Sequence, residues 1–221
     1  MLAKELISDV VPAVKTSDSG AQVLNWMDHF RISHMPIVNN SDFLGLISDS
    51  DIYSLDNPDE AIGNHSLSLF SPFVDANKHL FEVFELVNRL KLTVVPVLGS
   101  GKEYLGVITL IGLVDSFANL MSVDQPGAVL VFNMTVNDYS LTEMARIVEE
   151  NNARILSSNV VTIPDTSQVE VTIKTNKTDV TSIIRSFERY DYNISAKFLD
   201  NEELDDLYLN KYEEFMRYLN T

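Results

Sequence analysis

Cysteine is absent from this chain of 221 residues, which excludes disulfide bonds, thiolate metal sites and thiol catalysis together. Long apolar runs are also missing, since none approaches the roughly 18 residues that a membrane-spanning helix needs. The first residues, MLAKELISDVV, lack the apolar core of a secretion signal. We therefore expect a cytoplasmic protein that does not span a membrane.

Basic residues are scarce, because 16 lysines and arginines face 32 aspartates and glutamates, for a net charge of −16. Nucleic acids and anionic membrane surfaces both require a basic face on their partner. No cluster of lysine and arginine provides one, so neither partner is expected. The acid excess on its own indicates only good solubility. The remaining composition, 45% hydrophobic and 22% charged, is that of an ordinary globular protein.

One phrase occurs twice in the sequence. GLISDSDI begins at Gly45, and GVITLIGL begins at Gly106. Upstream, Pro36 matches Pro96 at an offset of sixty residues, and the offset becomes sixty-one after the turn that follows. A constant offset over about forty residues indicates an internal duplication.

Both copies predict the same order of elements. A short strand leads into a helix with apolar residues at helical spacing, and a strand–turn–strand follows. The second helix starts at Ser48 in copy one and at Thr109 in copy two. The order β-α-β-β-α is thus predicted twice, in copy one at about 1–60 and in copy two at about 61–122.

The pattern changes after the duplication. Residues 127–199 predict the order βαββαβ of a ferredoxin-like fold, with a capping box from Ser140 to Glu143 at its first helix. Residues 200–221 predict an acidic amphipathic helix, which either docks on its own domain or makes a dimer contact. The predicted fold class is therefore α+β, with a boundary between two domains near residues 122–125.

The repeated pattern of strand, helix, hPhh, turn and Gly-h-h-Ser/Thr-x-x-Asp resembles a tandem pair of CBS domains, also called a Bateman module. The unit at 127–199 resembles an ACT domain, and the combination resembles regulatory proteins of the acetoin-utilisation type. These resemblances imply a non-enzymatic, homodimeric regulator that binds an adenosine-containing ligand and acts on an unknown target protein. The alternative is a ligand-free scaffold in which both modules only assemble subunits.

Ser48 and Asp51 carry the chemistry of the repeated phrase. A hydroxyl residue that opens a helix presents backbone N–H groups and a positive dipole end, which suit phosphate or ribose oxygens. A carboxylate three residues later lies one turn along the same face and can accept from two vicinal hydroxyls. The same spacing is also a plain helix cap with an acid in the first turn, and the two interpretations are compatible.

The resemblance implies that Asp51 binds the ribose diol and that Ser48 contacts sugar or phosphate. The adenine slot would be lined by Val14, Thr16, Met35, Pro36 and Ile47. In copy two, Thr109 keeps the cap but Gly112 replaces the acid. We therefore expect one competent site, together with a weak second site formed by Val74, Asn77, Pro96 and Thr109.

Few cations surround the first motif, with Lys15, Arg31 and His34 as the nearest candidates. This scarcity favours AMP, adenosine or S-adenosylmethionine over ATP, whose triphosphate needs more counter-charge. In the ACT-like unit, the loop expected to bind a small amino acid includes Asn137 and Asp138. It lacks the glycine of the family's Asp-x-x-Gly pattern, which favours dimerisation as this unit's role.

No catalytic, metal or cofactor site is expected. Gly99 to Lys102 imitates the end of a phosphate loop, but Pro96 and Glu103 occupy positions where that loop needs a glycine and a hydroxyl residue. The four histidines lack metal-ligand spacing.

Overall fold

The structure is a computed structural model, and it describes residues 1–65 and 69–199. The chain divides into two units, Met1–Phe117 and Ala118 onward. The helix predicted at 200–221 lies outside the described residues. None of the helices in the described ranges has the length and apolar character required to cross a membrane.

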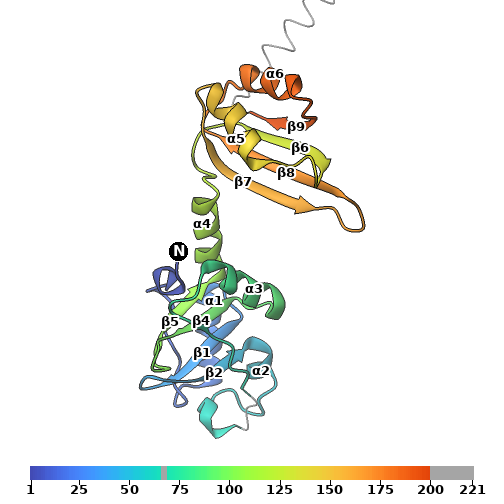
Figure 1. Cartoon of the computed structure of the whole chain (residues 1–221). Coiled ribbons are helices and arrows are strands. Elements are labelled where there is room, and N and C mark those ends of the chain that lie inside the picture. Colours follow the sequence, from blue (N-terminus) through green and yellow to red (C-terminus); the bar gives the residue numbers. More distant parts are fainter. Residues whose placement is uncertain (66–68, 200–221) are drawn as a thin grey trace, which may run out of the picture. The chain divides into compact units, whose positions relative to one another are not determined.

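The first unit contains the predicted order β-α-β-β-α twice, which confirms that part of the α+β fold class (Figure 1). In copy one the first strand is a single parallel bridge from Val14 to Ile37. Copy one continues with α1 (Gly20–Phe30), β1 (His34–Asn39), β2 (Asp42–Ser48) and α2 (Asp49–Tyr53). Copy two consists of β3 (Val74–Asp75), α3 (Leu80–Leu90), β4 (Val94–Leu98), β5 (Tyr104–Thr109) and α4 (Leu110–Leu120).

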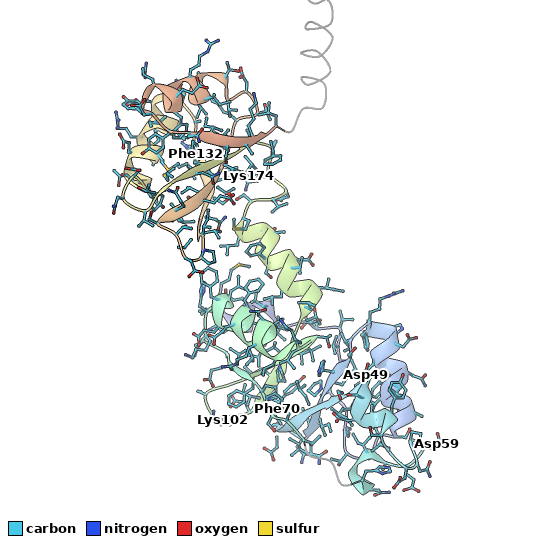
Figure 2. All side chains as sticks on the ribbon, turned by 90° about the vertical axis from the view of Figure 1, so that its right-hand side faces the viewer. Asp49, Asp59, Phe70, Lys102, Phe132 and Lys174 are labelled. Atoms are coloured by element: carbon cyan, nitrogen blue, oxygen red, sulfur yellow. The ribbon has the colours of Figure 1, made fainter. Side chains whose placement is uncertain are left out.

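Each copy begins with a leading segment, ahead of its first strand, that pairs with the other copy. Ser8, in the leading segment of copy one, forms an antiparallel bridge with Val107 in β5. Phe70, in the leading segment of copy two and labelled in Figure 2, forms one with Leu46 in β2. Both copies contribute buried side chains to one hydrophobic core. The two copies are therefore interdependent, because each needs the other's leading segment to complete its sheet.

The glycine of each repeated phrase allows the leading segment of the other copy to pair with its strand. Gly45 and Gly106 have φ angles of 154° and 151°, which L side chains rarely adopt. A Cβ at Gly45 would lie 2.8 Å from the Cβ of Leu69, and a Cβ at Gly106 would overlap Ile7. Both glycines thus allow the leading segment of the other copy to approach the strand closely.

The second unit has the predicted order βαββαβ: β6 (Val129–Thr135), α5 (Leu141–Glu150), β7 (Ile155–Thr162), β8 (Gln168–Thr175), α6 (Thr181–Arg189) and β9 (Ile194–Phe198). The sheet order is β7-β8-β6-β9 with antiparallel neighbours throughout. Leu130 and Phe132 pair with Ile173 and Val171, so these side chains share one face. Both helices pack on that face through residues such as Phe187, whose ring centroid lies 4.6 Å from that of Phe132. The ferredoxin-like arrangement is confirmed.

Candidate functional site

Ser48 and Asp51 form a reciprocal capping box at the start of α2. The Asp51 N–H donates to Ser48 Oγ over 3.1 Å. Asp51 Oδ2 in turn accepts from the Ser48 N–H at 2.8 Å and from the Ser48 hydroxyl at 2.7 Å. Asp51 is exposed, and within the described residues its Oδ1 has no hydrogen-bond partner. Asp49, labelled in Figure 2, lies in the same first turn.

The predicted adenine slot of copy one is mostly core. Val14, Met35, Pro36 and Ile47 are buried, and Met35 pairs with Ile47 across the two strands. Thr16 lies next to Asn39, and its hydroxyl exchanges hydrogen bonds with the Asn39 side chain. Asn39 ends β1, whereas Ser48 pairs with the first residue of that strand. Thr16 and Ser48 are thus at opposite ends of a six-residue strand, about 17 Å apart along its length.

Copy two keeps the helix cap without the carboxylate. Thr109 Oγ1 accepts from the Gly112 N–H at 3.1 Å. Of the other members of the predicted weak site, Val74 pairs with Val97 near the far end of β4, and Pro96 lies in the middle of that strand. Val74 and Pro96 are buried, while Asn77 is exposed and accepts a hydrogen bond from Lys4 Nζ at 3.2 Å.

A cavity of about 310 Å³ opens beside the start of α4. Small-molecule pockets usually measure about 300–1,000 Å³. Four segments form its wall: the leading segment of copy one, the end of α1, Thr93 just ahead of β4, and the start of α4. The lining residues are Ser8, Val10, Val11, Phe30, Arg31, Ile32, Thr93, Thr109, Leu110 and Ile111. Of the residues predicted for either site, Thr109 alone lines this cavity.

Several polar groups of the cavity lie at the start of α4. The Leu110 N–H donates to the Thr93 carbonyl at 3.0 Å, and the Gly112 N–H is taken by Thr109. The Ile111 N–H between them has no partner among the described residues, so it is available to an oxygen of a ligand. Arg31 supplies a guanidinium to the lining and also borders a second cavity of about 330 Å³ with Asp28 and Asp49.

His34 connects the two copies near both helix starts. Its Nδ1 lies 3.1 Å from Thr93 Oγ1, and Thr93 is the counterpart of Ser33 in copy two. Burial lowers the pKa of His34, and the carboxylates of Asp49 and Asp51 offset that effect only in part. Folding therefore favours the neutral imidazole.

This pKa shift predicts a loss of stability in acid. Below pH 6.5 the unfolded chain takes up a proton on His34 before the folded chain does, so the free energy of unfolding falls as the pH falls. Denaturant titrations above and below this pH should show a smaller fall for His34→Asn than for wild type. His29→Asn, at an exposed helix position, is the control. An equal pH dependence in wild type and His34→Asn would contradict the assignment.

In the described part of the chain, no three histidine, aspartate or glutamate side chains form a group that could hold a metal ion. The predicted loop of the second unit, with Asn137 and Asp138, lies between β6 and α5. Both residues are exposed, and Asp138 Oδ2 accepts from the Thr135 hydroxyl at 2.7 Å. The Asp138 carboxylate therefore stabilises its own turn.

Most of copy one matches a known protein family. Residues 3–56 match the family model of the CBS domain. Copy two repeats the elements of this segment in the same order. No curated protein matches the sequence.

Solved structures resemble about half of the chain. A CBS domain pair/ACT domain protein from Thermotoga maritima is 18% identical, with a TM-score of 0.48 over 54% of this chain and 98% of that chain. CBSX2 in complex with AMP is 17% identical, with a TM-score of 0.46 over 53% and 96%. The CBS domains of a transcriptional regulator from Streptococcus pneumoniae are 19% identical, with a TM-score of 0.46 over 52% and 98%. The AMP in the CBSX2 structure is a ligand of that protein.

Proposed function

We propose that the first unit binds an adenosine-containing ligand, such as AMP, adenosine or S-adenosylmethionine, and that the chain is a non-enzymatic cytoplasmic regulator. The cavity beside α4 is the main support. Its apolar wall suits an adenine ring, and the polar groups at the helix start suit sugar or phosphate oxygens. The match of residues 3–56 to the CBS domain supports the same function.

In copy one we assign the ribose contact to Asp51 and a sugar or phosphate contact to Ser48. Asp51 Oδ2 holds the cap, which leaves Oδ1 to accept from a ribose hydroxyl, so both roles can coexist. The base would lie in the slot of Val14, Thr16, Met35, Pro36 and Ile47. Because four of these side chains are buried, the strands must give way to admit the ring.

Copy two would bind more weakly, because Gly112 provides no carboxylate for the ribose. The second site comprises Thr109 at the cavity, with Val74, Asn77 and Pro96 as its further proposed members. Arg31 is the only lysine or arginine among the residues that line the cavity. One guanidinium matches a monophosphate better than a triphosphate.

For the second unit we propose dimerisation as the main role, in an ACT-like domain at 127–199 that is separate from the CBS pair at 1–122. The regulated target would be another protein. A small ligand at Asn137 and Asp138 has less support, because the Asp138 carboxylate is already bonded to Thr135.

Calorimetric titration of the full chain with AMP, adenosine, S-adenosylmethionine and ATP tests the proposed ligand class. We expect AMP to bind more tightly than ATP, since counter-charge for three phosphates is lacking. Tighter binding of ATP would contradict the charge argument. A folded chain that binds none of the four would favour the ligand-free scaffold.

A further inference from the structure

Helices α5 and α6 leave one face of the sheet in the second unit open. Both helices pack on the face that carries Leu130, Phe132 and Ile173. On the opposite face, the pairing register arranges the side chains in rows across the strands. The first row is Phe198, Val129, Lys174 and Ser157, the second is Ala196, Val131, Thr172 and Asn159, and the third is Asn133, Glu170 and Val161.

This open face exposes large apolar side chains at two opposite corners. Val161 on β7 is 58% exposed, and Phe198 on β9 is 62% exposed. Three further apolar residues of the face are partly buried: Val129, Val131 and Ala196. The charged residues in the three rows, Glu170 and Lys174, have opposite signs. An exposed apolar patch among polar groups usually marks a contact surface, so this face suits an apolar partner segment.

The linker before β6 occupies a third corner of the face. Lys174, labelled in Figure 2, donates from Nζ to the Val123 carbonyl at 3.0 Å. The Asn159 side chain contacts Met121 Sδ at 3.8 Å. Both contacts lie to one side of the diagonal that joins the two exposed corners. This diagonal runs from β9 to β7 across the whole sheet and is about 20 Å long.

The chain that follows β9 has the length and the apolar pattern to cover this diagonal. It leaves the sheet at Phe198, which is one of the exposed corners. In residues 200–221, which lie outside the described residues, the sequence places apolar side chains at helical spacing: Leu204, Leu207, Tyr208, Phe215 and Leu219. A helix over 204–219 is about 24 Å long, which matches the diagonal. Asp206 and Glu213 fall on the side opposite to the apolar stripe.

We propose that residues 204–219 form a helix that docks on this open face in the same chain, along the diagonal from Phe198 to Val161. Its apolar stripe covers both exposed side chains, and its acidic side faces water. Residues 199–203 span up to about 16 Å, enough for the chain to turn back over the sheet. This inference is independent of the proposed ligand and of the proposed dimer.

Connectivity identifies the chain's own segment as the occupant. A segment joined to the face by a short linker acts at an effective concentration of about 1 mM. A second copy in dilute solution does not compete with that concentration. Two copies also repel each other, because each carries a net charge of −16.

Thiol modification measures whether the face is covered, because the wild-type chain contains no cysteine and one introduced thiol gives the whole signal. Val161→Cys places that thiol on the open face. Val160→Cys is the matched control on the same strand, since Val160 is 42% exposed and pairs with Val171 on the face that carries the helices. Leu207→Asp together with Phe215→Asp breaks the apolar stripe and leaves every described residue unchanged.

With the stripe intact, the thiol at position 161 should react roughly tenfold or more slowly than with the stripe broken, because only the undocked fraction reacts. The thiol at position 160 should react at the same rate in both backgrounds. Equal rates at position 161, or equal slowing at both positions, would overturn the proposal.

An excess of wild-type chain, added to Val161→Cys with the broken stripe, tests which copy supplies the segment. Wild type carries an intact segment and no thiol, so any slowing reports docking from another copy. We expect no slowing. Restored protection would show that the face binds the segment of a second copy, which contradicts docking within one chain.

Discussion

Asp51→Ala is expected to weaken the binding of AMP and adenosine roughly 10- to 100-fold, because hydrogen bonds from the ribose to a charged carboxylate contribute about 1.5–3 kcal/mol. The helix start should lose only about 1 kcal/mol or less. The Ser48 hydroxyl still accepts from the N–H of residue 51, and that half of the capping box survives. Calorimetry should therefore show a large loss of affinity alongside a small fall in melting temperature.

Asp49→Ala is the matched control for this experiment. Asp49 lies in the same first turn, and among the described residues its carboxylate accepts a hydrogen bond only from the neighbouring Ser50 N–H, at 2.7 Å. Its removal takes the same charge from the same helix end without touching the proposed ribose contact. Adenosine has no phosphate, so its affinity is free of the repulsion between a phosphate and the carboxylates of Asp49 and Asp51. If Asp51→Ala lowers the melting temperature but leaves both affinities unchanged, the carboxylate is a cap alone.

Gly112→Asp is expected to strengthen binding at the second site by a similar factor, roughly 10- to 100-fold. A Cβ at this position would meet only the Thr109 hydroxyl, at 3.2 Å, and the cavity beside α4 is already formed. The new carboxylate would recreate in copy two the arrangement of Ser48 and Asp51. Calorimetry should then detect two comparable sites in place of one tight site.

Gly112→Ala separates the carboxylate from the backbone effect. Replacing a glycine in a helix stabilises it by roughly 0.5–1 kcal/mol through lost freedom of the unfolded chain. Both variants share that gain, whereas the aspartate alone adds an acceptor for ribose. Equal affinities of Gly112→Ala and Gly112→Asp would show that the carboxylate does not determine which copy binds.

The duplication and the element order could be predicted from sequence because they depend on local patterns. The apolar spacing of the helices recurs in both copies, and the paired prolines and paired glycines recur at offsets of sixty and sixty-one residues. The ferredoxin-like order of the second unit followed from the same kind of pattern. Each of these features needs only the residues within one element or its neighbours.

The cavity could not be predicted in the same way, because it depends on how the leading segment of copy one pairs with a strand of copy two. The periodicity of residues 1–12 does not indicate that Ser8 pairs with β5 of the other copy. Gly45 and Gly106 carry the available signal. A glycine inside a strand pattern often marks close approach by another backbone, which here is the leading segment of the other copy.

The predicted sites also combined residues from both ends of a strand. Thr16 and Ser48 belong to one repeat, and the order of elements does not reveal which ends of neighbouring strands meet. The register places Ser48 against His34, and Thr16 bonds to Asn39 at the far end of β1. Such positions require the pairing register, which the sequence pattern alone left open.

Counting the sites for AMP by calorimetry on the wild-type chain is the most direct test of whether the first unit binds an adenosine-containing ligand. It also tests whether the missing carboxylate of copy two makes the two sites unequal. We expect about one tight site per chain, with any second site clearly weaker. Two sites of equal affinity would contradict the role given to Gly112, and the absence of binding by a folded chain would contradict the sensor function itself.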